Sequence, residues 1–505
     1  MTAATTWHRS LTHLLDGIVE QNVPECAIEF VTMDSRLVKP GSLFLATNGI
    51  KRHGLEFAQQ AFANGAVAIL FEPAKGVVAP FAPPGKIVLA VNHLSAHIGV
   101  IAARFFDEPS LDIKVCGVTG TNGKSTVTHL IASALHLAGQ RCGQMGTLGF
   151  GLNDPLTKSD MTTPDAVSVQ QRLGWLREQR ATHVAMEVSS HALDQHRVNG
   201  VAFDVAVFTN LSRDHLDYHA DLDEYATAKK RLFEQFPITH AVINADDALG
   251  RELIQSTSLQ TPVTVVSAQG PESVKEARNL IRAVDIETHA DGLAFNVSSA
   301  FGTGRVQSTM LGNFNVLNLI SALGVLLHWG VPFDQALAAL GRVKAPAGRM
   351  ESFGREDGAR FVVDFAHTPD ALANAIKVLR QHCKGQLWVV FGCGGDRDRG
   401  KRPQMAAAAQ SADRVIVTND NPRYEDPDVI ISEIMPGFSD ASNVVIQQDR
   451  SDAIEYTIEN AGPDDVVLIA GKGHEDYQLV GGERIELCDR GLVNQFLQQV
   501  SVEQV

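Results

Sequence analysis

The chain has 505 residues, of which 44% are hydrophobic and 20% are charged, a balance typical of globular proteins and not of disordered or fibrous ones. That length exceeds what one hydrophobic core supports and predicts about three domains, at roughly 100 to 200 residues per domain. The formal net charge of −15 argues against a nucleic-acid partner, because binding to a phosphate backbone needs a basic surface.

The start of the chain, MTAATTWHRSLTHLLDGIVE, has no basic segment followed by an apolar run. No stretch reaches the roughly 18 apolar residues of a membrane span, so we expect a cytoplasmic protein without one. The six cysteines are scattered without a CxxC pair, which favours reduced structural thiols. A reactive thiol is an alternative only for Cys393, which lies in a glycine cluster. The working expectation for the oligomeric state is a monomer.

Residues 1–107 are predicted to form a small α/β domain. Short apolar runs, such as SLFLA at 42–46 and AVAILF at 66–71, are separated by glycine and proline. The proline-rich stretch at 77–86 is predicted to be a surface loop of this domain.

Residues 108–341 are predicted to form a central mononucleotide-binding domain with a parallel sheet. Continuous apolar runs that end in polar residues are typical of strands covered on both faces, with the chemistry at their carboxyl ends. Helical periodicity is present at 221–236 and 315–330. The expected strands are KVCGVTG, HVAMEVSS at 183–190, DVAVFTN at 204–210 and HAVINADD at 240–247.

Residues 342–505 are predicted to form a third, Rossmann-like α/β domain. The run GRVKAPAGR at 341–349 breaks the periodicity, and a new alternation of strands and helix-like segments follows it. Its expected strands are RFVVDFA, QLWVVFGCGG, DRVIVTND and DDVVLIAGKG.

The segment KVCGVTGTNGKST predicts a phosphate-binding loop, because an apolar strand leads through glycines to a Lys-Ser pair at a helix start. Lys124 is expected to reach the β- and γ-phosphates of ATP, and Ser125 to bind Mg²⁺. The strict GxxxxGK[ST] pattern is absent, since Val118 occupies its first glycine position. A simple glycine turn would explain Gly120 and Gly123 but gives no reason for the Lys-Ser-Thr that follows.

Two further strand ends carry candidate metal ligands. Glu187 follows a predicted strand and suits Mg²⁺, although a helix-capping role fits it equally well. His215 and His219 have HxxxH spacing, which would suggest zinc only with a third ligand on a confirmed helix. We therefore do not expect zinc.

Ten motifs occur along the chain in a fixed order, and together they resemble the Mur ligases of peptidoglycan synthesis. The resemblance covers essentially the whole sequence. The motifs are GTNGKST, MEVSSHALDQHR, NLSRDHLDYH, YATAK, LGNFNVLN, GRME, VVDFAHTPDAL, FGCGGDRDRGKRP, DNPR and AGKGHE.

This resemblance implies a site for ATP and Mg²⁺. It assigns catalytic roles to Lys124, His215 and Lys229, the last carrying a CO₂-derived carbamate that binds metal. The expected metal ligands are Ser125, Glu187, His215 and Lys229. The expected ATP-binding residues, between the central and C-terminal domains, are Gly120, Thr121, Asn122, Gly123, Lys124, Ser125, Thr126, Asn315, Asn318, Arg349 and Asp364.

Spacing alone leaves two of these matches open. A Lys-Lys pair on an amphipathic helix is ordinarily a solvated face, which is the alternative for Lys229. His367 and Asp370, in the same motif as Asp364, fit equally well as a turn and a helix N-cap before the segment PDALANAIKVL.

The resemblance also implies that the N-terminal and central domains bind a UDP-N-acetylmuramoyl dipeptide. Asp34, Ser35 and Arg36 resemble the family's DSR segment. Two positions depart from the family pattern: Ile50 replaces a common histidine, and Met161 replaces a common polar residue. The residues expected to bind this substrate are Met33, Ser35, Thr162, Thr163, Ser189, Gln195 and Arg197.

The C-terminal domain is expected to select the amino acid that is added. Because meso-2,6-diaminopimelate carries a distal carboxylate that lysine lacks, the guanidinium of Arg423 favours diaminopimelate. The resemblance therefore implies an amide ligase that joins diaminopimelate to UDP-N-acetylmuramoyl-L-alanyl-D-glutamate through an acyl phosphate. The residues expected to bind diaminopimelate are Arg397, Asp420, Asn421, Pro422, Arg423, Gly471 and Glu475.

Two other functions are alternatives. A folylpolyglutamate synthase has a similar core and also forms an amide through an acyl phosphate, but it would not explain DNPR or GDRDRGKRP. A non-catalytic nucleotide-binding switch would leave the DNPR and GKGHE segments without a purpose.

Overall fold

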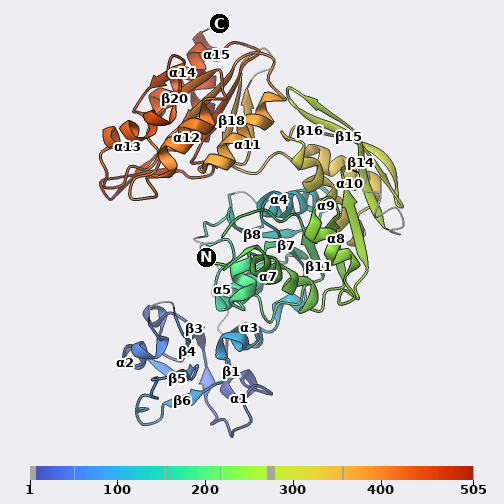
Figure 1. Cartoon of the computed structure of the whole chain (residues 1–505). Coiled ribbons are helices and arrows are strands. Elements are labelled where there is room, and N and C mark those ends of the chain that lie inside the picture. Colours follow the sequence, from blue (N-terminus) through green and yellow to red (C-terminus); the bar gives the residue numbers. More distant parts are fainter. Residues whose placement is uncertain are drawn as a thin grey trace. The chain divides into compact units, whose positions relative to one another are not determined.

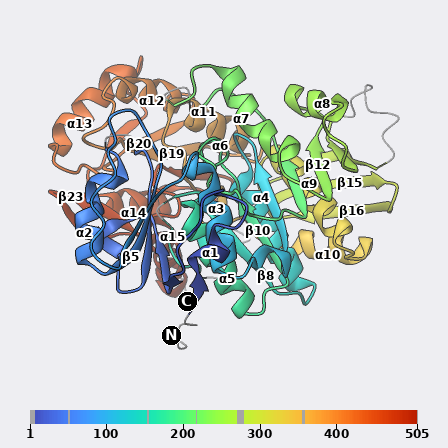
Figure 2. The same ribbon diagram turned by 90° about the horizontal axis from the view of Figure 1, so that it is seen from below.

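The structure is a computed structural model that describes residues 7–49, 52–152, 155–159, 161–215, 218–269, 279–354 and 358–503. These residues form two compact units (Figures 1 and 2). Of the described residues, unit 1 contains those up to Val266 together with Asn279 and Gly324–Trp329. Unit 2 contains Ser267–Gln269, Leu280–Leu323 and the residues from Gly330 onward. The predicted α/β class is confirmed.

The first sheet of unit 1 has four parallel strands in the order β3-β4-β5-β6. The strands predicted at 42–46 and 66–71 are confirmed with the same bounds. The proline-rich stretch at 77–86 lies outside the helices and strands and exposes 91% of Phe81, which confirms the predicted loop. The elements are β3 (Phe30–Thr32), β4 (Ser42–Ala46), β5 (Ala66–Phe71), β6 (Ile87–Ala90) and the helix α3 (Leu94–Phe105).

The second sheet of unit 1 follows the order β13-β12-β11-β7-β10-β8-β9, in which only β9 is antiparallel to its neighbour. All four predicted strands are present. The strands are β7 (Lys114–Thr119), β8 (Cys142–Gly146), β9 (Gly149–Gly151), β10 (His183–Glu187), β11 (Val205–Phe208), β12 (His240–Asn244) and β13 (Val263–Ser267). The helices include α4 (Lys124–Leu137), α5 (Ala166–Glu178), α6 (Ser190–Asp194), α7 (Leu222–Glu234) and α8 (Ala248–Gln255).

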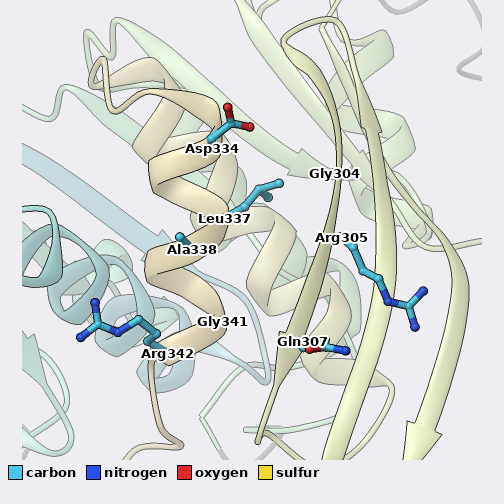
Figure 3. Close-up of a pocket in the computed structure, with 8 residues that line it drawn as sticks. All are labelled: Gly304, Arg305, Gln307, Asp334, Leu337, Ala338, Gly341 and Arg342. Atoms are coloured by element: carbon cyan, nitrogen blue, oxygen red, sulfur yellow. The ribbon is translucent and has the colours of Figure 1, made fainter.

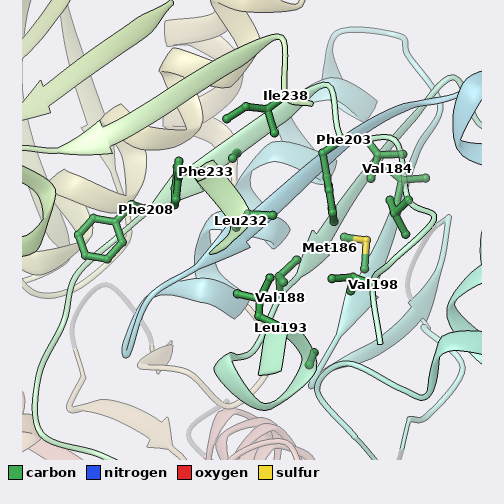
Figure 4. Close-up of a cluster of buried hydrophobic side chains, with 14 of the residues drawn as sticks. Val184, Met186, Val188, Leu193, Val198, Phe203, Phe208, Leu232, Phe233 and Ile238 are labelled. Atoms are coloured by element: carbon green, nitrogen blue, oxygen red, sulfur yellow. The ribbon is translucent and has the colours of Figure 1, made fainter. Parts of the chain in front are cut away.

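A hydrophobic cluster against this sheet explains the continuous apolar runs of its strands (Figure 4). Met186 of β10, Phe208 of β11 and Leu232 of α7 are all buried in it. Phe203 lies so close to β7 that a Cβ on Gly117 would be 2.7 Å from its ring. Burial of such side chains contributes roughly 1.5 to 3 kcal/mol each, so the sheet is a rigid support for the loops at its edge.

Strand order decides where those loops lie. β7 is flanked by β10 on one side and β11 on the other, and all three run parallel. Their carboxyl ends therefore meet at one edge of the sheet. That edge carries Gly120–Gly123, Glu187 and Thr209–Ser212.

Unit 2 contains three antiparallel strands, part of the ten-stranded sheet, that the sequence analysis did not predict. They are β14 (Leu280–His289), β15 (Gly292–Ser299) and β16 (Gly302–Ser308). These strands do not have the continuous apolar runs from which the other strands were predicted. In β14, buried or half-buried residues alternate with exposed ones along most of the strand. The helix α9 (Phe314–His328) confirms the helix predicted at 315–330, and α10 (Phe333–Arg342) follows it.

The larger sheet of unit 2 has the order β17-β18-β22-β19-β20-β21, with β17 antiparallel. Cys393 packs in its core, and burial raises the pKa of this thiol to about 12, which favours the structural interpretation. The strands are β17 (Glu351–Gly354), β18 (Arg360–Asp364), β19 (Leu387–Phe391), β20 (Arg414–Val417), β21 (Val444–Ile446) and β22 (Val466–Ala470), with a hairpin of β23 (Tyr477–Val480) and β24 (Glu483–Glu486). Its helices are α11 (Pro369–Arg380), α12 (Lys401–Ala409), α13 (Pro427–Ile434), α14 (Arg450–Asn460) and α15 (Asp489–Glu503).

Among the described residues, no helix combines the length and apolar character needed to cross a bilayer.

Three histidines of unit 1 gather around Asp204, at the end of the sheet opposite the loops described above. The rings of His240 and His328 stack with centroids 4.2 Å apart, and His183 packs against Trp329 at 4.6 Å. His328 Nε2 lies 3.8 Å from Asp204 Oδ2, and the Trp329 indole donates to the same carboxylate. Burial, joined by repulsion from Lys114 for His183 and from His328 for His240, lowers the pKa of each to about 4, although Asp204 acts in the opposite direction.

These histidines predict that stability falls on acidification. Between about pH 6.5 and about pH 4 the unfolded histidines bind protons that the folded ones do not, so at about pH 5.5 each contributes a loss of about 1 kcal/mol. We expect a lower free energy of unfolding by urea at about pH 5.5 than at about pH 7.5. His240→Gln should reduce that difference. An equal difference in the variant and the native protein would contradict the assignment to His240.

Candidate active site

The glycine loop adopts a backbone that side chains at two of its positions would prevent. Gly120 has a φ of +148°, and a Cβ there would lie 1.9 Å from Thr209 Oγ1. Gly123 has a φ of +87° and immediately precedes α4, whose first residue is Lys124. Only glycine adopts such angles at little cost, so both glycines are needed for the tight turn from β7 into the helix.

The segment Thr209–Ser212, after β11, holds this loop in place. Thr209 Oγ1 donates to the Asn122 carbonyl at 2.6 Å, and the Asn122 amide donates to Asn210 Oδ1 at 2.9 Å. The Thr121 amide donates to the Asn210 carbonyl at 2.8 Å, and the Ser212 amide donates to Thr121 Oγ1 at 3.0 Å. The sequence analysis assigned no role to Thr209, Asn210 or Ser212. Their role in holding the loop follows from the pairing of β7 with β11, which places the two segments side by side.

Two lysines converge on one backbone carbonyl of the loop. Lys124 Nζ donates to the Gly120 carbonyl at 2.9 Å and to the Thr121 carbonyl at 2.8 Å. Lys229 Nζ donates to the same Gly120 carbonyl at 2.8 Å. This edge of the sheet therefore concentrates positive charge where a phosphate-binding loop was predicted.

Lys229 is buried, which excludes the solvated-face interpretation of the Lys-Lys pair. Only 1% of Lys229 is exposed, and its Nζ lies 4.2 Å from the centre of the Tyr225 ring. Burial, and then repulsion from Lys124, holds the pKa of Lys229 well below its usual range. Its neighbour Lys230 is the surface lysine and pairs with Glu252.

Glu187 lies at the end of β10 and is 1% exposed. Its Oε1 accepts a hydrogen bond from the Thr147 amide at 2.8 Å, and its Oε2 accepts one from the Thr147 hydroxyl at 3.3 Å. The N-cap of α6 is Ser189, whose hydroxyl accepts from the Ala192 amide at 3.1 Å. The helix-capping interpretation of Glu187 is therefore wrong.

His215 is exposed and has a left-handed backbone, with a φ of +53°. Its ring lies 4.9 Å from that of His191 and 6.0 Å from that of Tyr225, which also contacts Lys229. His219 is buried, and its Nε2 hydrogen-bonds Ser190 Oγ at 3.0 Å. The two histidines of the HxxxH pair thus have different surroundings.

The donor chemistry of this region fits Mg²⁺. Ser125 and Glu187 offer hard oxygens, which Mg²⁺ prefers, and His215 offers a nitrogen. An amine offers no oxygen, so Lys229 fits Mg²⁺ as a ligand only when it is carbamylated. In the part of the chain that the structure describes, no three His, Cys, Asp or Glu side chains cluster as a ready metal site.

The predicted dipeptide-binding residues of the central domain form one hydrogen-bonded network with Glu187. Thr162 Oγ1 and Thr147 Oγ1 lie 3.0 Å apart, and Thr147 also binds the Glu187 carboxylate. Thr163 Oγ1 donates to the Glu187 carbonyl at 2.8 Å and accepts from the Ser189 amide at 3.1 Å. The candidate metal ligand and three of the expected substrate residues therefore share one support.

Arg197 extends this network outward. It donates to Gln195 Oε1 from Nε at 3.0 Å and from Nη2 at 2.6 Å, and to the Thr163 carbonyl from Nη1 at 2.9 Å. Burial lowers the pKa of Arg197 from its ordinary value. Met161, where the family usually has a polar residue, lies with its sulfur 3.6 Å from Arg197 Nη1.

The DSR segment of the N-terminal sheet lies just after β3. Arg36 forms an ion pair with Asp34 at 2.6 Å, and Ser35 Oγ donates to Gln60 Oε1 at 3.1 Å. Met33 is half-buried against the hydrophobic core and not fully presented to solvent. Ile50, the other departure from the family pattern, lies outside the described residues.

In unit 2, the residues expected to bind ATP fall into two groups. Asn315 and Asn318 are buried at the start of α9, where Asn318 Nδ2 donates to Asn315 Oδ1 at 2.8 Å and Asn315 Nδ2 to the Leu311 carbonyl at 2.8 Å. The second group is Arg349 and Asp364. Asp364 accepts from the Met350 amide at 2.8 Å, and burial raises the pKa of its carboxyl.

The Arg349 guanidinium lies 4.9 Å from the centre of the Phe365 ring. Within the described residues, its buried Nε has no hydrogen-bond partner, as expected for a group that contacts an anionic ligand. The capping interpretation of the nearby motif needs correction. Thr368, and not Asp370, is the N-cap of α11, while His367 Nδ1 contacts the Phe365 carbonyl in the preceding turn.

The expected diaminopimelate residues lie on three loops that follow β19, β20 and β22. Arg423 Nη1 donates to the Gly395 carbonyl at 2.8 Å, and a Cβ on Gly394 would lie 2.8 Å from that nitrogen and 3.7 Å from Arg397. The two arginines therefore flank the same glycine. Arg423 also has a left-handed backbone, with a φ of +55°.

The loops after β20 and β22 are joined at Glu475. Its Oε2 accepts from Asn421 Nδ2 at 3.1 Å and from Lys472 Nζ at 3.0 Å, and Lys472 Nζ also donates to Asn421 Oδ1 at 3.1 Å. Gly471 has a φ of +114°, and a Cβ there would lie 2.7 Å from Asp420 Oδ2. Cationic and anionic groups thus lie close together on these loops, as a zwitterionic amino acid requires.

A separate hollow of 450 Å³ lies between β16 and α10 in unit 2 (Figure 3). None of the predicted site residues lines it. Its Arg305 forms an ion pair with Glu287 at 2.7 Å, and Figure 3 shows Arg342 directed away from β16. The hollow brings together no set of groups that points to a ligand.

Comparison with known proteins covers most of the chain. Residues 27–106 match the Mur ligase family catalytic domain, 118–326 the Mur ligase middle domain and 348–473 the Mur ligase glutamate ligase domain. A UDP-N-acetylmuramoyl-L-alanyl-D-glutamate--2,6-diaminopimelate ligase of Coxiella burnetii is 43% identical over 95% of this chain and 97% of its own. The ligase of that name from Xanthomonas campestris is 46% identical over 92% and 93%, respectively.

The chain belongs to the Mur ligase family. A solved structure of a ligase of the same name superimposes on this Mur ligase with a TM-score of 0.73 at 37% identity, over 98% of this chain and 99% of that one. A folylpolyglutamate synthase of Mycobacterium tuberculosis superimposes over 74% of the chain with a TM-score of 0.58 at 18% identity, which shows a shared fold alone.

Gly120→Ala should weaken nucleotide binding in this Mur ligase. The methyl group would overlap Thr209 Oγ1 and require a backbone angle that alanine disfavours, so the loop must move. We expect the Kd for ADP, measured by calorimetry, to rise at least about tenfold.

Gly139→Ala is the matched control, because Gly139 also has a positive φ, of +80°, but a Cβ there meets nothing within 4 Å. It should lower stability by about 1 kcal/mol and leave the Kd for ADP unchanged. Equal effects of the two variants on that Kd would mean that backbone strain, and not the contact with Thr209, controls the loop.

Proposed function

We propose that the protein is the ATP-dependent ligase that adds meso-2,6-diaminopimelate to UDP-N-acetylmuramoyl-L-alanyl-D-glutamate, with ADP and phosphate as the other products. The observation that carries this proposal is the convergence of Lys124 and Lys229 on the Gly120 carbonyl, next to a network that links Glu187 to the expected substrate residues. The similarity to ligases of this name at 43% and 46% identity supports the same substrates. Because ATP is the co-substrate, we propose the cytoplasm as the place of action.

The proposed reaction has two steps. The side-chain carboxylate of the D-glutamyl residue attacks the γ-phosphorus of ATP, which forms an acyl phosphate and releases ADP. An amine of diaminopimelate then attacks the acyl carbon, the bond from that carbon to the phosphate oxygen breaks, and phosphate leaves as the amide nitrogen loses a proton. The γ-phosphate of ATP thus activates a carboxylate and is not left on the product.

The first step must bring two anions together, so neutralisation of charge dominates it. We propose that Lys124 binds the triphosphate together with the N-terminus of α4, which begins at the same residue. Thr162, Thr163 and Arg197 are proposed to orient the dipeptide. Arg349, whose buried Nε lacks a protein partner within the described residues, is proposed to bind a nucleotide oxygen.

Mg²⁺ bound by Ser125, Glu187 and His215 would supply further charge neutralisation. We propose that Lys229 joins these ligands as a carbamate. Its depressed pKa supports this role, because a neutral amine is the form that reacts with CO₂. The amine nitrogen would form a bond to the carbon of CO₂ and lose a proton, and the resulting carbamate would be an anion that binds metal and attracts Lys124.

Amino-acid selection is proposed to depend on charge. Arg423, with Arg397 beside the same glycine, would bind a carboxylate in the bidentate manner of a guanidinium. Glu475, held by Asn421 and Lys472, would accept from an ammonium group. Lysine lacks the distal carboxylate and would leave an arginine unpaired.

The choice of amino acid predicts a strong preference between two substrates. With ATP and the UDP-muramoyl dipeptide present, kcat/KM from ADP release should be about a hundredfold higher with meso-diaminopimelate than with L-lysine. Omission of the dipeptide should abolish amino-acid-dependent ADP release. Arg423→Ala should reduce the preference, whereas Arg414→Ala, at the exposed beginning of β20, should not. Equal rates with both amino acids would reject diaminopimelate as the substrate.

Lys229→Ala should lower kcat by about a hundredfold or more, because the site loses both a ligand for metal and a charge beside the phosphates. Lys230→Ala is the control, since Lys230 lies on the same helix and pairs with Glu252 at the surface. Its kcat should stay within about twofold of the native value. Near-native kcat in Lys229→Ala would remove Lys229 from the mechanism.

A further inference from the structure

A buried ion pair in unit 2 belongs to none of the motifs of the sequence. Arg450 begins α14 and Asp489 begins α15. Their side chains are 0% exposed, and the guanidinium donates to the carboxylate from Nε and from Nη2, each at 2.8 Å. The pair is 39 residues apart in sequence, so only the packing of the two helices brings it together.

The same guanidinium binds two backbone carbonyls beneath the proposed amino-acid pocket. Arg450 Nη2 donates to the Ala470 carbonyl at 2.9 Å, and Nη1 donates to the Asn419 carbonyl at 3.3 Å. Ala470 ends β22 and directly precedes Gly471. Asn419 directly precedes Asp420. Arg450 therefore links the bases of the two loops that carry Asp420–Arg423 and Gly471–Glu475.

The distance between these two loops is tightly constrained. A Cβ on Gly471 would lie only 2.7 Å from Asp420 Oδ2, and Asn421 reaches across to Glu475 at 3.1 Å. A displacement of about 1 Å in a binding group can cost much of its interaction with a ligand. A rigid link at the base of both loops would fix their spacing before the amino acid binds.

Stability alone does not account for this arrangement. Replacing a buried ion pair with apolar residues of similar volume is often neutral or stabilising, because burial of two charges costs about as much as their attraction returns. A guanidinium has donors in a fixed planar fork, and here that fork meets one carboxylate and two carbonyls at once. What the pair provides is a fixed geometry between three segments.

We propose that Arg450, oriented by Asp489, is a positioning residue for amino-acid selection. It sets the distance between the loop at 419–423 and the loop at 471–475, and so controls affinity for the diamino acid without touching it. This inference rests on the proposed function, in which both loops bind diaminopimelate.

The test is a double variant, Arg450→Met with Asp489→Leu, which removes both buried charges together and so avoids leaving either one unpaired. Steady-state ADP release would be measured as each substrate is varied, and unfolding by urea would be followed in parallel. We expect the KM for meso-diaminopimelate to rise about tenfold or more. The KM for the UDP-muramoyl dipeptide, whose proposed residues lie in unit 1, should stay within about twofold.

Ile454→Ala is the control for loss of stability, because Ile454 is buried on the same helix and its side chain lies in the hydrophobic core. It should lower the urea concentration at the midpoint of unfolding without changing the KM for diaminopimelate. Arg450→Lys keeps a charge and a donor but not the fork. It should raise this KM less than the double variant does, and it provides the same test if the double variant does not fold.

An unchanged KM for diaminopimelate in the folded variants, or an equal rise in Ile454→Ala, would overturn the proposal. The native protein separates this outcome from failure of the proposed function. If native enzyme releases no ADP in response to diaminopimelate, the function itself is wrong. If native enzyme does so and the variants keep its KM, only the role of Arg450 is wrong.

Discussion

The Gly120 carbonyl oxygen is the point on which the candidate active site depends. Two buried or half-buried lysines donate to it, and Lys124 also donates to the next carbonyl of the loop. Such a concentration of positive charge is costly in a protein interior unless an anion offsets it. A triphosphate beside Lys124 and a carbamate on Lys229 would both lower this cost, which gives nucleotide binding and lysine modification one electrostatic origin.

The parallel sheet of unit 1 positions the other groups of the candidate site around these lysines. Because β7 lies between β10 and β11, the glycine loop, Glu187 and the Thr209–Ser212 segment all meet at one edge. The last of these segments binds the loop through hydrogen bonds to Thr121 and Asn122. Rigid apolar packing beneath the sheet keeps these loops from relaxing independently.

In unit 2, too, buried side chains hold the loops that carry the proposed binding residues. Its proposed amino-acid site is held by hydrogen bonds from buried cations to backbone carbonyls and carboxylates, with Lys472 between two of the expected ligand-binding residues and Arg450 beneath both loops. Arg402, also fully buried, pairs with Glu425 and Glu433 and contacts the Gly394 carbonyl at 3.4 Å. Buried guanidinium groups thus support each of the three loops that carry the proposed specificity.

The sequence by itself determined the α/β class, most of the buried strands and the strand-loop-helix order around Gly120. These features depend on local periodicity and on residue types with strong conformational or chemical preferences, which a linear pattern preserves. The motif order also determined the family. The antiparallel strands β14–β16 escaped prediction because their half-buried alternation gives a weaker pattern than a continuous apolar run.

Only the tertiary structure decided which residues support the site. Spacing favoured a solvated Lys229, yet packing of α7 against the sheet buries it, and Ser189 and Thr368 took the capping positions considered for Glu187 and Asp370. The contacts of Thr209 with Asn122 and of Arg450 with Asp489 join segments 87 and 39 residues apart. Such contacts follow from strand order and helix packing, which arise from the burial of the whole core and are not encoded in any local stretch of the chain.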